Sequence, residues 1–164
     1  MRAPLTSGVR LLDCAHMNKT SSIAAVAILS VGAIVTAHAS RSNYSGTWEM
    51  DLRSASERNA NAECGFATFK LKQAGHNITG EHSFATVGCG RLNEGGKGTV
   101  QGKVQNGKAV LVVTSGRNGA VVRGIAELQG SNLLWQTLEE IKPGAPEGDS
   151  PLILRQGVLH RVGK

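Results

Sequence analysis

The sequence predicts an all-β fold: a single eight-stranded antiparallel up-and-down barrel over residues 40–164, preceded by a signal peptide. Short segments of alternating apolar and polar residues follow one another along the chain, and Gly and Asn turns separate them, with 21 Gly among 164 residues. No apolar repeat of the helical period, about 3.6 residues, extends over a useful length after residue 40. Closing the sheet removes both exposed edge strands, which favours the barrel over the alternative, a curved or half-open β-sandwich.

The first 39 residues have the pattern of a cleavable secretory signal. An apolar run at residues 23–37 follows Lys19, and Ala37-His38-Ala39 supplies the small-x-small motif. We expect cleavage after Ala39 and a translation start at Met17, which opens the more regular leader. The run is shorter than the roughly 20 apolar residues of a spanning helix, so no membrane anchor is expected after cleavage. These features predict a periplasmic or secreted protein.

Three alternating segments open the domain, at residues 44–52, 66–73 and 78–84. Alternation of apolar and polar side chains is the pattern of a strand with one buried face. The polar stretch 53–63 between the first two is predicted to be a loop with one helical turn. A four-residue turn at 74–77 makes the second and third segments a hairpin.

Cys64 and Cys89 are the cysteines of the predicted exported domain. Pairing Gln73 with Ile78 across the turn places Cys64 opposite position 87, within two residues of Cys89. An even number of cysteines in a small exported domain indicates a disulfide. A Cys64–Cys89 bridge is therefore predicted to staple the open end of the hairpin. Redox or zinc chemistry is disfavoured because the two cysteines lack CxxC spacing and a neighbouring His.

Five further strands are predicted after a Gly-rich loop at residues 88–98. Asn106-Gly107, the strongest hairpin signal in the chain, joins the first two of them through a type I′ turn. Residues 142–151, with three Pro and two Gly, are predicted to form a flexible loop before the last strand. The strands are expected at residues 99–104, 108–114, 120–128, 133–141 and 152–162.

Gly46-Thr47-Trp48 on the first strand resembles the Gly-x-Trp start of calycins, the lipocalin and avidin superfamily. Residues 67–81 are also similar to the second hairpin of avidin-like barrels. The resemblance implies that Trp48 closes one end of the barrel against an Arg of the final strand, either Arg155 or Arg161. Avidins line their site with several Trp residues, whereas this chain has only two, and the Thr-Asp-Tyr motif of lipocalins is missing. The resemblance therefore implies a fold and transfers no ligand.

Composition and charge exclude several classes of function. The formal net charge is +6, but Lys and Arg are spread along the chain with acids between them, whereas nucleic-acid binders cluster their cations on one face. No nucleic-acid partner is expected, and a weak polyanion site stays as a minor alternative. The chain has no Gly-x-Ser-x-Gly elbow, P-loop or His-Glu-x-x-His motif, and its His residues show no metal-ligand spacing. We therefore expect no enzymatic activity, no cofactor and no metal.

Three residues are candidates for contacts with a ligand: His82, Phe84 and Trp135. His82 and Phe84 share one face of their strand with Ile78, so His82 is either a hydrogen-bonded core residue or a ligand contact. Trp135, in the penultimate strand, either belongs to the core or stacks on a ligand near the barrel mouth.

Two classes of function remain. The first is a binding module for an unidentified small molecule, apolar in character and held at one end of the barrel. The alternative is a protein-facing module, such as an exported inhibitor or an envelope interaction protein, that acts through the loops 88–98 and 142–151. An interior cavity smaller than about 300 Å³ would disfavour the first.

Overall fold

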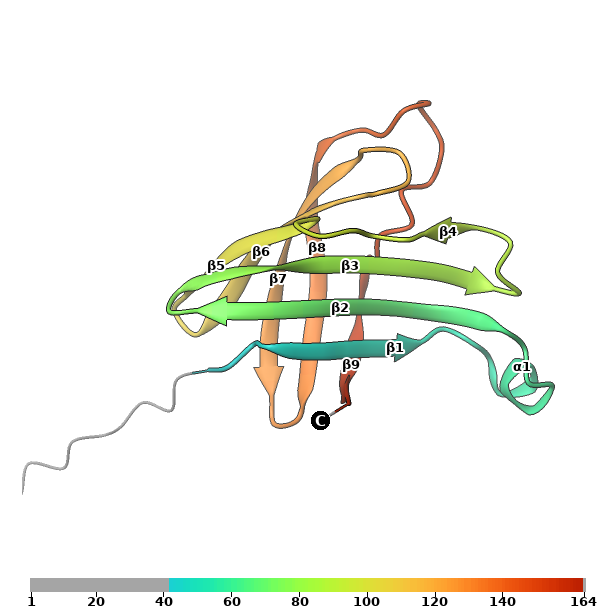
Figure 1. Ribbon diagram of the computed structural model, residues 1–164, viewed down its shortest axis with the longest axis horizontal. Coiled ribbons are helices and arrows are strands. Elements are labelled where there is room, and N and C mark those ends of the chain that lie inside the picture. The colour runs from blue at the N-terminus through green and yellow to red at the C-terminus, as the bar shows by residue number, and fades with distance from the viewer. Residues whose placement is uncertain (1–41, 164) are drawn as a thin grey trace, which may run out of the picture. The chain divides into compact units, whose positions relative to one another are not determined.

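The computed structural model describes residues 42–163, and these residues form an all-β fold (Figure 1). The predicted signal peptide and its cleavage site lie outside the described residues. Within the described residues, no helix is long and apolar enough to cross a membrane. The elements are β1 (Gly46–Asp51), α1 (Ala55–Asn59), β2 (Cys64–Ala74), β3 (Asn77–Val87), β4 (Leu92–Asn93), β5 (Val100–Gln105), β6 (Lys108–Thr114), β7 (Val121–Gln129), β8 (Asn132–Lys142) and β9 (Gln156–Val162).

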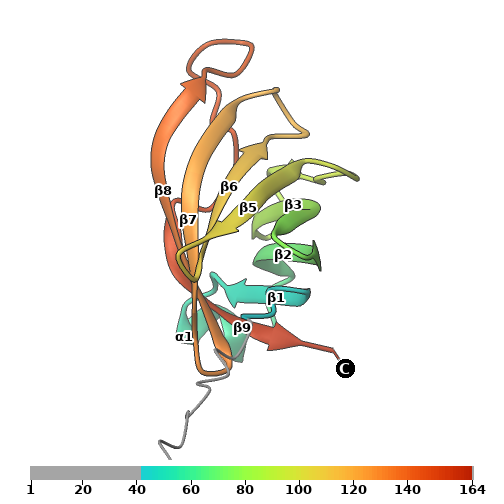
Figure 2. The ribbon, with the colours of Figure 1, turned by 90° about the vertical axis from the view of Figure 1, so that its left-hand side faces the viewer.

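Eight of the strands close into an antiparallel barrel. Pairing runs from β1 through β2, β3, β5, β6, β7, β8 and β9, and β9 then pairs with β1 at Thr47–Glu49. The two residues of β4 pair only with β3. The predicted eight-stranded barrel is confirmed, and the half-open sandwich is excluded. The sheet is coiled, since β7 and β8 cross the direction of β2 and β3 in Figure 1 and are curved in Figure 2.

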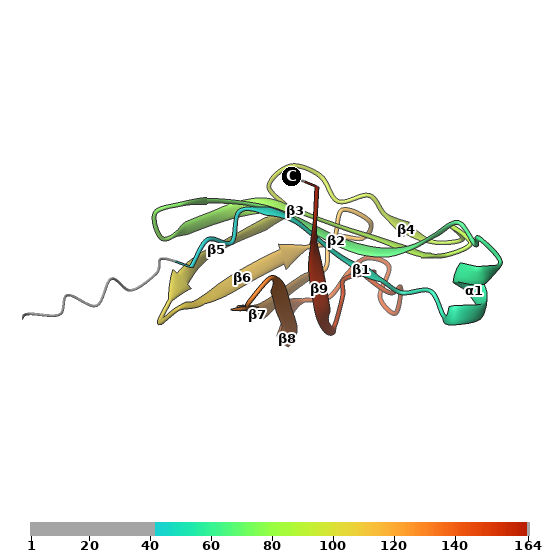
Figure 3. The same cartoon turned by 90° about the horizontal axis from the view of Figure 1, so that it is seen from below.

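The two ends of the barrel are built differently. Tight turns at residues 75–76, 106–107 and 130–131 join the strands at one end, which we call the turn end. Longer connections lie at the opposite end, which we call the loop end; they cover residues 52–63, 88–99, 115–120 and 143–155. The first of these contains α1, which projects beyond β1 and β2 (Figure 3). Its capping box, formed between Ser54 and Glu57, confirms the predicted helical turn.

The β2–β3 hairpin has the register that the sequence predicts. Gln73 pairs with Ile78, and Cys64 pairs with Val87. Cys89 lies two residues beyond this last pair and forms the predicted disulfide with Cys64, with their Cα atoms 5.3 Å apart. The bridge joins the start of β2 to the chain just after β3, so it closes the hairpin at the loop end.

The β5–β6 hairpin is also as predicted. Gln105 pairs with Lys108 across a two-residue turn. Both turn residues have positive φ, 50° at Asn106 and 78° at Gly107, which is the conformation that a type I′ turn requires. Asn and Gly are the residues that adopt this conformation at least cost.

Side chains fill the barrel interior by alternating small and large residues on neighbouring strands. Gly80 pairs with Leu71, and a Cβ at position 80 would lie 3.1 Å from the Leu71 side chain and would overlap the backbone of β2. A Cβ at Gly124 would overlap the Trp135 ring. The largest fully buried side chains are those of Trp48, Tyr44, Phe69, Ile78, Leu111, Leu133 and Leu159. The interior is therefore a packed core, in which glycine positions make room for large neighbours.

Three elements differ from those predicted. The last strand begins at Gln156 instead of residue 152, because side chains rather than a strand ladder hold residues 151–155. The short strand β4 lies within the predicted loop 88–98. The pairs between β7 and β8 skip Leu138 and Ile141, which leaves both side chains about half exposed at β-bulges. Alternation along the chain does not reveal any of these features.

Candidate functional site

His82, the first predicted ligand residue, lies on β3 and is fully buried at the loop end of the interior. Its ring stacks on Phe69 with centroids 4.3 Å apart. Its Nε2 accepts a hydrogen bond from the Leu154 backbone N–H at 3.2 Å, so the ring proton is assigned to Nδ1, which donates to the Thr68 carbonyl at 2.9 Å. Burial lowers the pKa of His82 to about 4, and the bond to Thr68 opposes this only in part. His82 is thus neutral, and both of its nitrogens are hydrogen-bonded within the chain.

Trp135, the second predicted residue, lies on β8 and approaches the same segment as His82. Its indole N–H donates to the Leu154 carbonyl at 2.7 Å, and its ring centroid lies 5.0 Å from that of Phe69. Phe84, the third, is only partly buried, on the same face of β3 as His82, and packs against the core. The structure therefore brings His82 and Trp135 together. Both are hydrogen-bonded to the backbone of Leu154 of the same chain.

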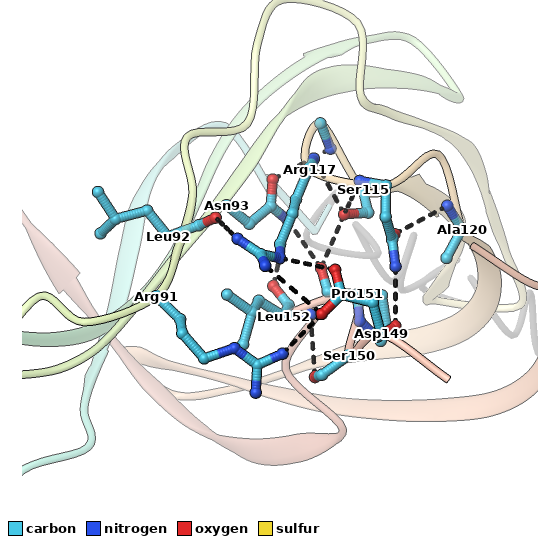
Figure 4. A network of polar contacts seen from close by, with 12 residues as sticks. Arg91, Leu92, Asn93, Ser115, Arg117, Ala120, Asp149, Ser150, Pro151 and Leu152 are labelled. Atoms are coloured by element: carbon cyan, nitrogen blue, oxygen red, sulfur yellow. Dashed lines mark hydrogen bonds and ion pairs between the residues drawn. The ribbon is translucent and has the colours of Figure 1, made fainter. Parts of the chain in front are cut away.

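Residues 151–155 cross the loop end as an irregular segment that buried side chains hold by its backbone. The Asn93 amide donates to the carbonyls of Leu152 at 3.1 Å and Pro151 at 3.4 Å, and Ser115 donates to the Pro151 carbonyl at 2.7 Å (Figure 4). The Asn93 side-chain oxygen also accepts from two loop N–H groups. Because Asn93 is almost fully buried, these four bonds satisfy a group that would otherwise be costly to bury.

The same segment carries three buried apolar side chains, and those of Ile153 and Leu154 belong to the core of the barrel. Leu152, Ile153 and Leu154 are all buried, and Leu154 also receives a hydrogen bond from the Thr137 hydroxyl on β8 at 3.1 Å. Leu152 adopts a φ of 49°, which is uncommon for a leucine and costs backbone energy. The contacts of the segment offset this cost, so residues 151–155 act as a plug that closes the loop end.

Asp149 joins the three loops that surround this plug. Its carboxylate pairs with Arg91 at 2.9 Å and with Arg117 at 3.0 Å, and both guanidinium groups point towards it in Figure 4. The two arginines hold the pKa of Asp149 below its usual range. Asn118 adds two bonds, since its side chain donates to the Asp149 carbonyl and its own carbonyl accepts from Ala145. The Pro-rich loop, predicted to be flexible, is thus tied to both neighbouring loops.

At the turn end, Tyr44 closes the barrel. Its side chain is fully buried, and its hydroxyl donates to the Gly107 carbonyl at 2.8 Å, with the Ala126 carbonyl at 3.3 Å. Burial raises the pKa of this phenol. The indole N–H of Trp48 donates to the Tyr44 carbonyl at 2.9 Å, so the two aromatic residues form one cap. Both ends of the barrel are therefore closed by residues of the chain itself.

Arg161, on β9, covers the outer side of this cap. Its guanidinium carbon lies 4.1 Å from the centroid of the Trp48 ring, and its nitrogens donate to the backbone carbonyls of Ser45 and Asn43. The Gly46 position leaves room for the guanidinium, because a Cβ there would overlap it. Of the two arginines that the family resemblance offered for this role, the structure selects Arg161.

Comparison with known proteins gives no match: no family model, no curated protein and no solved structure resembles this chain closely enough to be assigned. Within residues 42–163, no three His, Cys, Asp or Glu side chains gather in a geometry that could hold a metal ion.

Sequence reasoning named the loops 88–98 and 142–151 as candidate surfaces but missed the residues that connect them. Asn93, Ser115 and Asp149 lie in segments with strong turn composition, where polar residues are ordinary. Their partners lie up to 59 residues away, so no local pattern could pair them.

Proposed function

We propose that this protein is an exported binding module that docks another exported protein through its loop end. The observation that carries this proposal is the Asp149 carboxylate, which joins Arg91 and Arg117 and so ties loops 88–98, 115–120 and 143–155 into one surface. Loops on a rigid scaffold commonly carry recognition. A surface that is already ordered loses less conformational entropy on binding, which favours affinity.

The packing of the barrel supports this alternative over an apolar ligand in the interior. Nε2 of His82 and the indole N–H of Trp135 are hydrogen-bonded to the Leu154 backbone, and a ligand placed against them would have to displace the plug. Tyr44 and Trp48 close the opposite end, and the exposed fraction of each residue is 1% or less. A displacing ligand would need to replace every hydrogen bond that the plug makes, which is costly for an apolar molecule.

The loop end also offers surface that a partner could contact. The segment from Lys142 to Glu147 is largely exposed, although its neighbours Asn118 and Asp149 anchor it. Leu92 on β4 is 40% exposed beside Arg91. Arg is enriched at protein-binding surfaces, and Leu92 adds exposed apolar area beside it.

We also propose that the protein is exported and that its barrel is calycin-like. The Cys64–Cys89 disulfide is compatible with an oxidising compartment, the periplasm or the exterior, as the leader pattern predicts. The closed eight-stranded barrel, with Trp48 under Arg161, is consistent with a calycin-like barrel.

A site-specific photo-crosslinker tests the docking surface directly. We would place it at Glu147 at the loop end and, as a matched control, at Ser131 in the exposed β7–β8 turn. The expected result, in cells that express the protein naturally, is an adduct of protein mass from position 147 and none from position 131. Asp149→Ala should reduce the yield at position 147, because the loops lose their shared anchor. Equal yields at both positions, or a small molecule retained in native mass spectra without any protein adduct, would contradict the proposal.

A further inference from the structure

Two adjoining hollows lie on the outer face of the barrel, and the end of loop 88–99 contributes Lys97 and Gly98 to their lining. One is about 740 Å³ and lies over β1, β2 and β3; the other is about 700 Å³ and lies over β3, β5 and β6. They share Thr79 and Gly98, so they form one continuous depression, which we call the outer groove. Thr79 and Gln101 face outward here because their neighbours Ile78 and Val100 are buried in the core.

The outer groove holds an excess of positive charge. Lys70 is neutralised by Glu81 at 3.1 Å. Lys72, Lys97 and Lys103 also line the groove, and none of them forms an ion pair with a described residue. Elsewhere on the barrel, cations such as Lys108 and Arg123 pair with Glu127 and Glu139 across neighbouring strands. Three unpaired ammonium groups therefore surround one depression, where they raise the local concentration of anions.

The rest of the lining indicates what kind of anion fits. Hydroxyl and amide side chains lie between the lysines: Thr47, Thr79, Asn77, Gln101 and Thr114. The lining of the two hollows includes no aromatic residue. Single-stranded nucleic acids are normally held by base stacking on aromatic rings, so this lining does not suit them. It suits a ligand that is rich in hydroxyl groups and carries negative charge.

The lysines are spread along the groove, which favours an extended ligand over a single small anion. Lys72 on β2, Thr79 on β3 and Gln101 on β5 are direct neighbours across the sheet. Neighbouring strands lie about 4.8 Å apart, so this row spans roughly 10 Å. Lys103 lies two residues further along β5, and the bond from the Gly98 N–H to the Gly80 carbonyl holds Lys97 beside the row.

We propose that the outer groove binds a polyanionic carbohydrate chain, one that carries carboxylate, sulfate or phosphate groups. The three unpaired lysines bind its charged groups, and the threonine hydroxyls with the Asn77 and Gln101 amides bind its hydroxyls. Arg91, Arg117 and Asp149 do not line this site, so it does not use the ion pairs that join the loops at the loop end.

The test compares two triple variants that change the net charge equally. The groove variant is Lys72→Gln, Lys97→Gln and Lys103→Gln; the control is Lys108→Gln, Arg123→Gln and Lys142→Gln, all of them surface positions outside the groove. Binding of the purified protein is measured by calorimetry at several salt concentrations. The probes are polygalacturonate, dextran sulfate, neutral dextran and a thymidine oligonucleotide. The first two distinguish carboxylate from sulfate as the preferred anion.

We expect the wild-type protein to bind at least one of the two acidic polysaccharides and to ignore neutral dextran. The groove variant should weaken this binding roughly tenfold or more, and should lower the slope of log affinity against log salt by about two to three. The control should weaken it less than about threefold. Equal losses in both variants would show attraction by net charge alone and overturn the proposal. Absence of binding at low salt, or tighter binding of the oligonucleotide than of either polysaccharide, would also overturn it.

Discussion

The backbone N–H of Leu154 donates to Nε2 of His82 across 72 positions of sequence, at 3.2 Å and with both residues buried. This bond requires a neutral imidazole, because a proton on Nε2 would point a second donor at the N–H group. The stability of the loop end therefore depends on the protonation state of one histidine.

The first prediction concerns pH. Burial lowers the pKa of His82 to about 4 from an ordinary value of 6.5. Between these values the unfolded chain binds a proton that the folded protein does not, so the free energy of unfolding falls as the pH is lowered. The contribution of neutral His82 to the free energy of unfolding is fully present above pH 6.5. It is lost progressively down to about pH 4, and the total loss is on the order of 3 kcal/mol. Urea unfolding at pH 7.5, 5.5 and 4 measures it.

His82→Gln is the control for this experiment. Glutamine offers an acceptor and a donor but does not titrate, so the variant should lose most of the pH dependence in this window. Glu57, Asp51 and Asp149 have depressed pKa values, so their contributions are lost as the pH falls below the ordinary values of 4.5 for Glu and 3.8 for Asp. The wild type and the variant share these contributions, so the difference between them reports on His82. An equal slope in the variant would show that another group is responsible.

The second prediction concerns the cap at the turn end. Arg161→Ala removes the guanidinium that stacks on Trp48 and binds two backbone carbonyls. We expect the free energy of unfolding to fall by about 1–2 kcal/mol, and the tryptophan emission to shift to the red as water reaches the Trp48 ring. Arg155→Ala, an exposed arginine of similar charge near the start of β9, should change neither quantity. Similar effects of the two variants would show that the stacking of Arg161 on Trp48 does not stabilise the fold.

The third prediction concerns the disulfide. Cys64 and Cys89 are 25 residues apart, and the loop-closure entropy of such a bridge is worth about 3.5 kcal/mol. Replacing both cysteines by serine should lower the free energy of unfolding by this order and leave the barrel folded. Chemical denaturation of wild type and variant, each with and without a reductant, measures the difference. The variant should not respond to the reductant, and a wild type that also fails to respond would contradict a structural role.

The fourth prediction concerns the glycine positions inside the barrel. Gly124→Ala adds a methyl group that overlaps the Trp135 ring and lies 2.6 Å from the Gln136 carbonyl oxygen. The cost of such overpacking is about 2 kcal/mol or more. Gly90→Ala is the matched change in open space, where the nearest atom lies 4.0 Å away. Thermal unfolding should separate the two variants by several degrees. Comparable melting temperatures would mean that the strands shift to accept the methyl group.

Local patterns predicted the strands and turns well. Local apolar patterns located all eight strands of the barrel, although the last begins at Gln156 instead of residue 152, and Asn106-Gly107 specified its turn by the backbone conformation that these residues favour. The register of one hairpin then placed Cys64 opposite position 87, so the disulfide could be predicted by counting. These features are local or lie one hairpin apart, which is why sequence alone contains them.

The candidate site was predicted only in part. His82 and Trp135 were each predicted to be either a core residue or a ligand contact, and alternation cannot show that both contact Leu154. The run from Leu152 to Leu154 looks like the start of a strand, because three consecutive apolar residues satisfy that pattern equally well. Its actual role depends on side chains that come from β3, β4 and β8 and on Ser115, just after β6.

By itself, the sequence determined the all-β class, the order of the strands, the hairpin registers near the turns and the cysteine pair. Only the tertiary structure decided that residues 151–155 plug the loop end, that Asp149 connects three loops, and that Arg161 rather than Arg155 covers Trp48. The physical reason is distance along the chain. Strands and turns follow from the conformational preferences of adjacent residues, whereas these contacts join groups 17 to 118 residues apart and exist only once the barrel has closed.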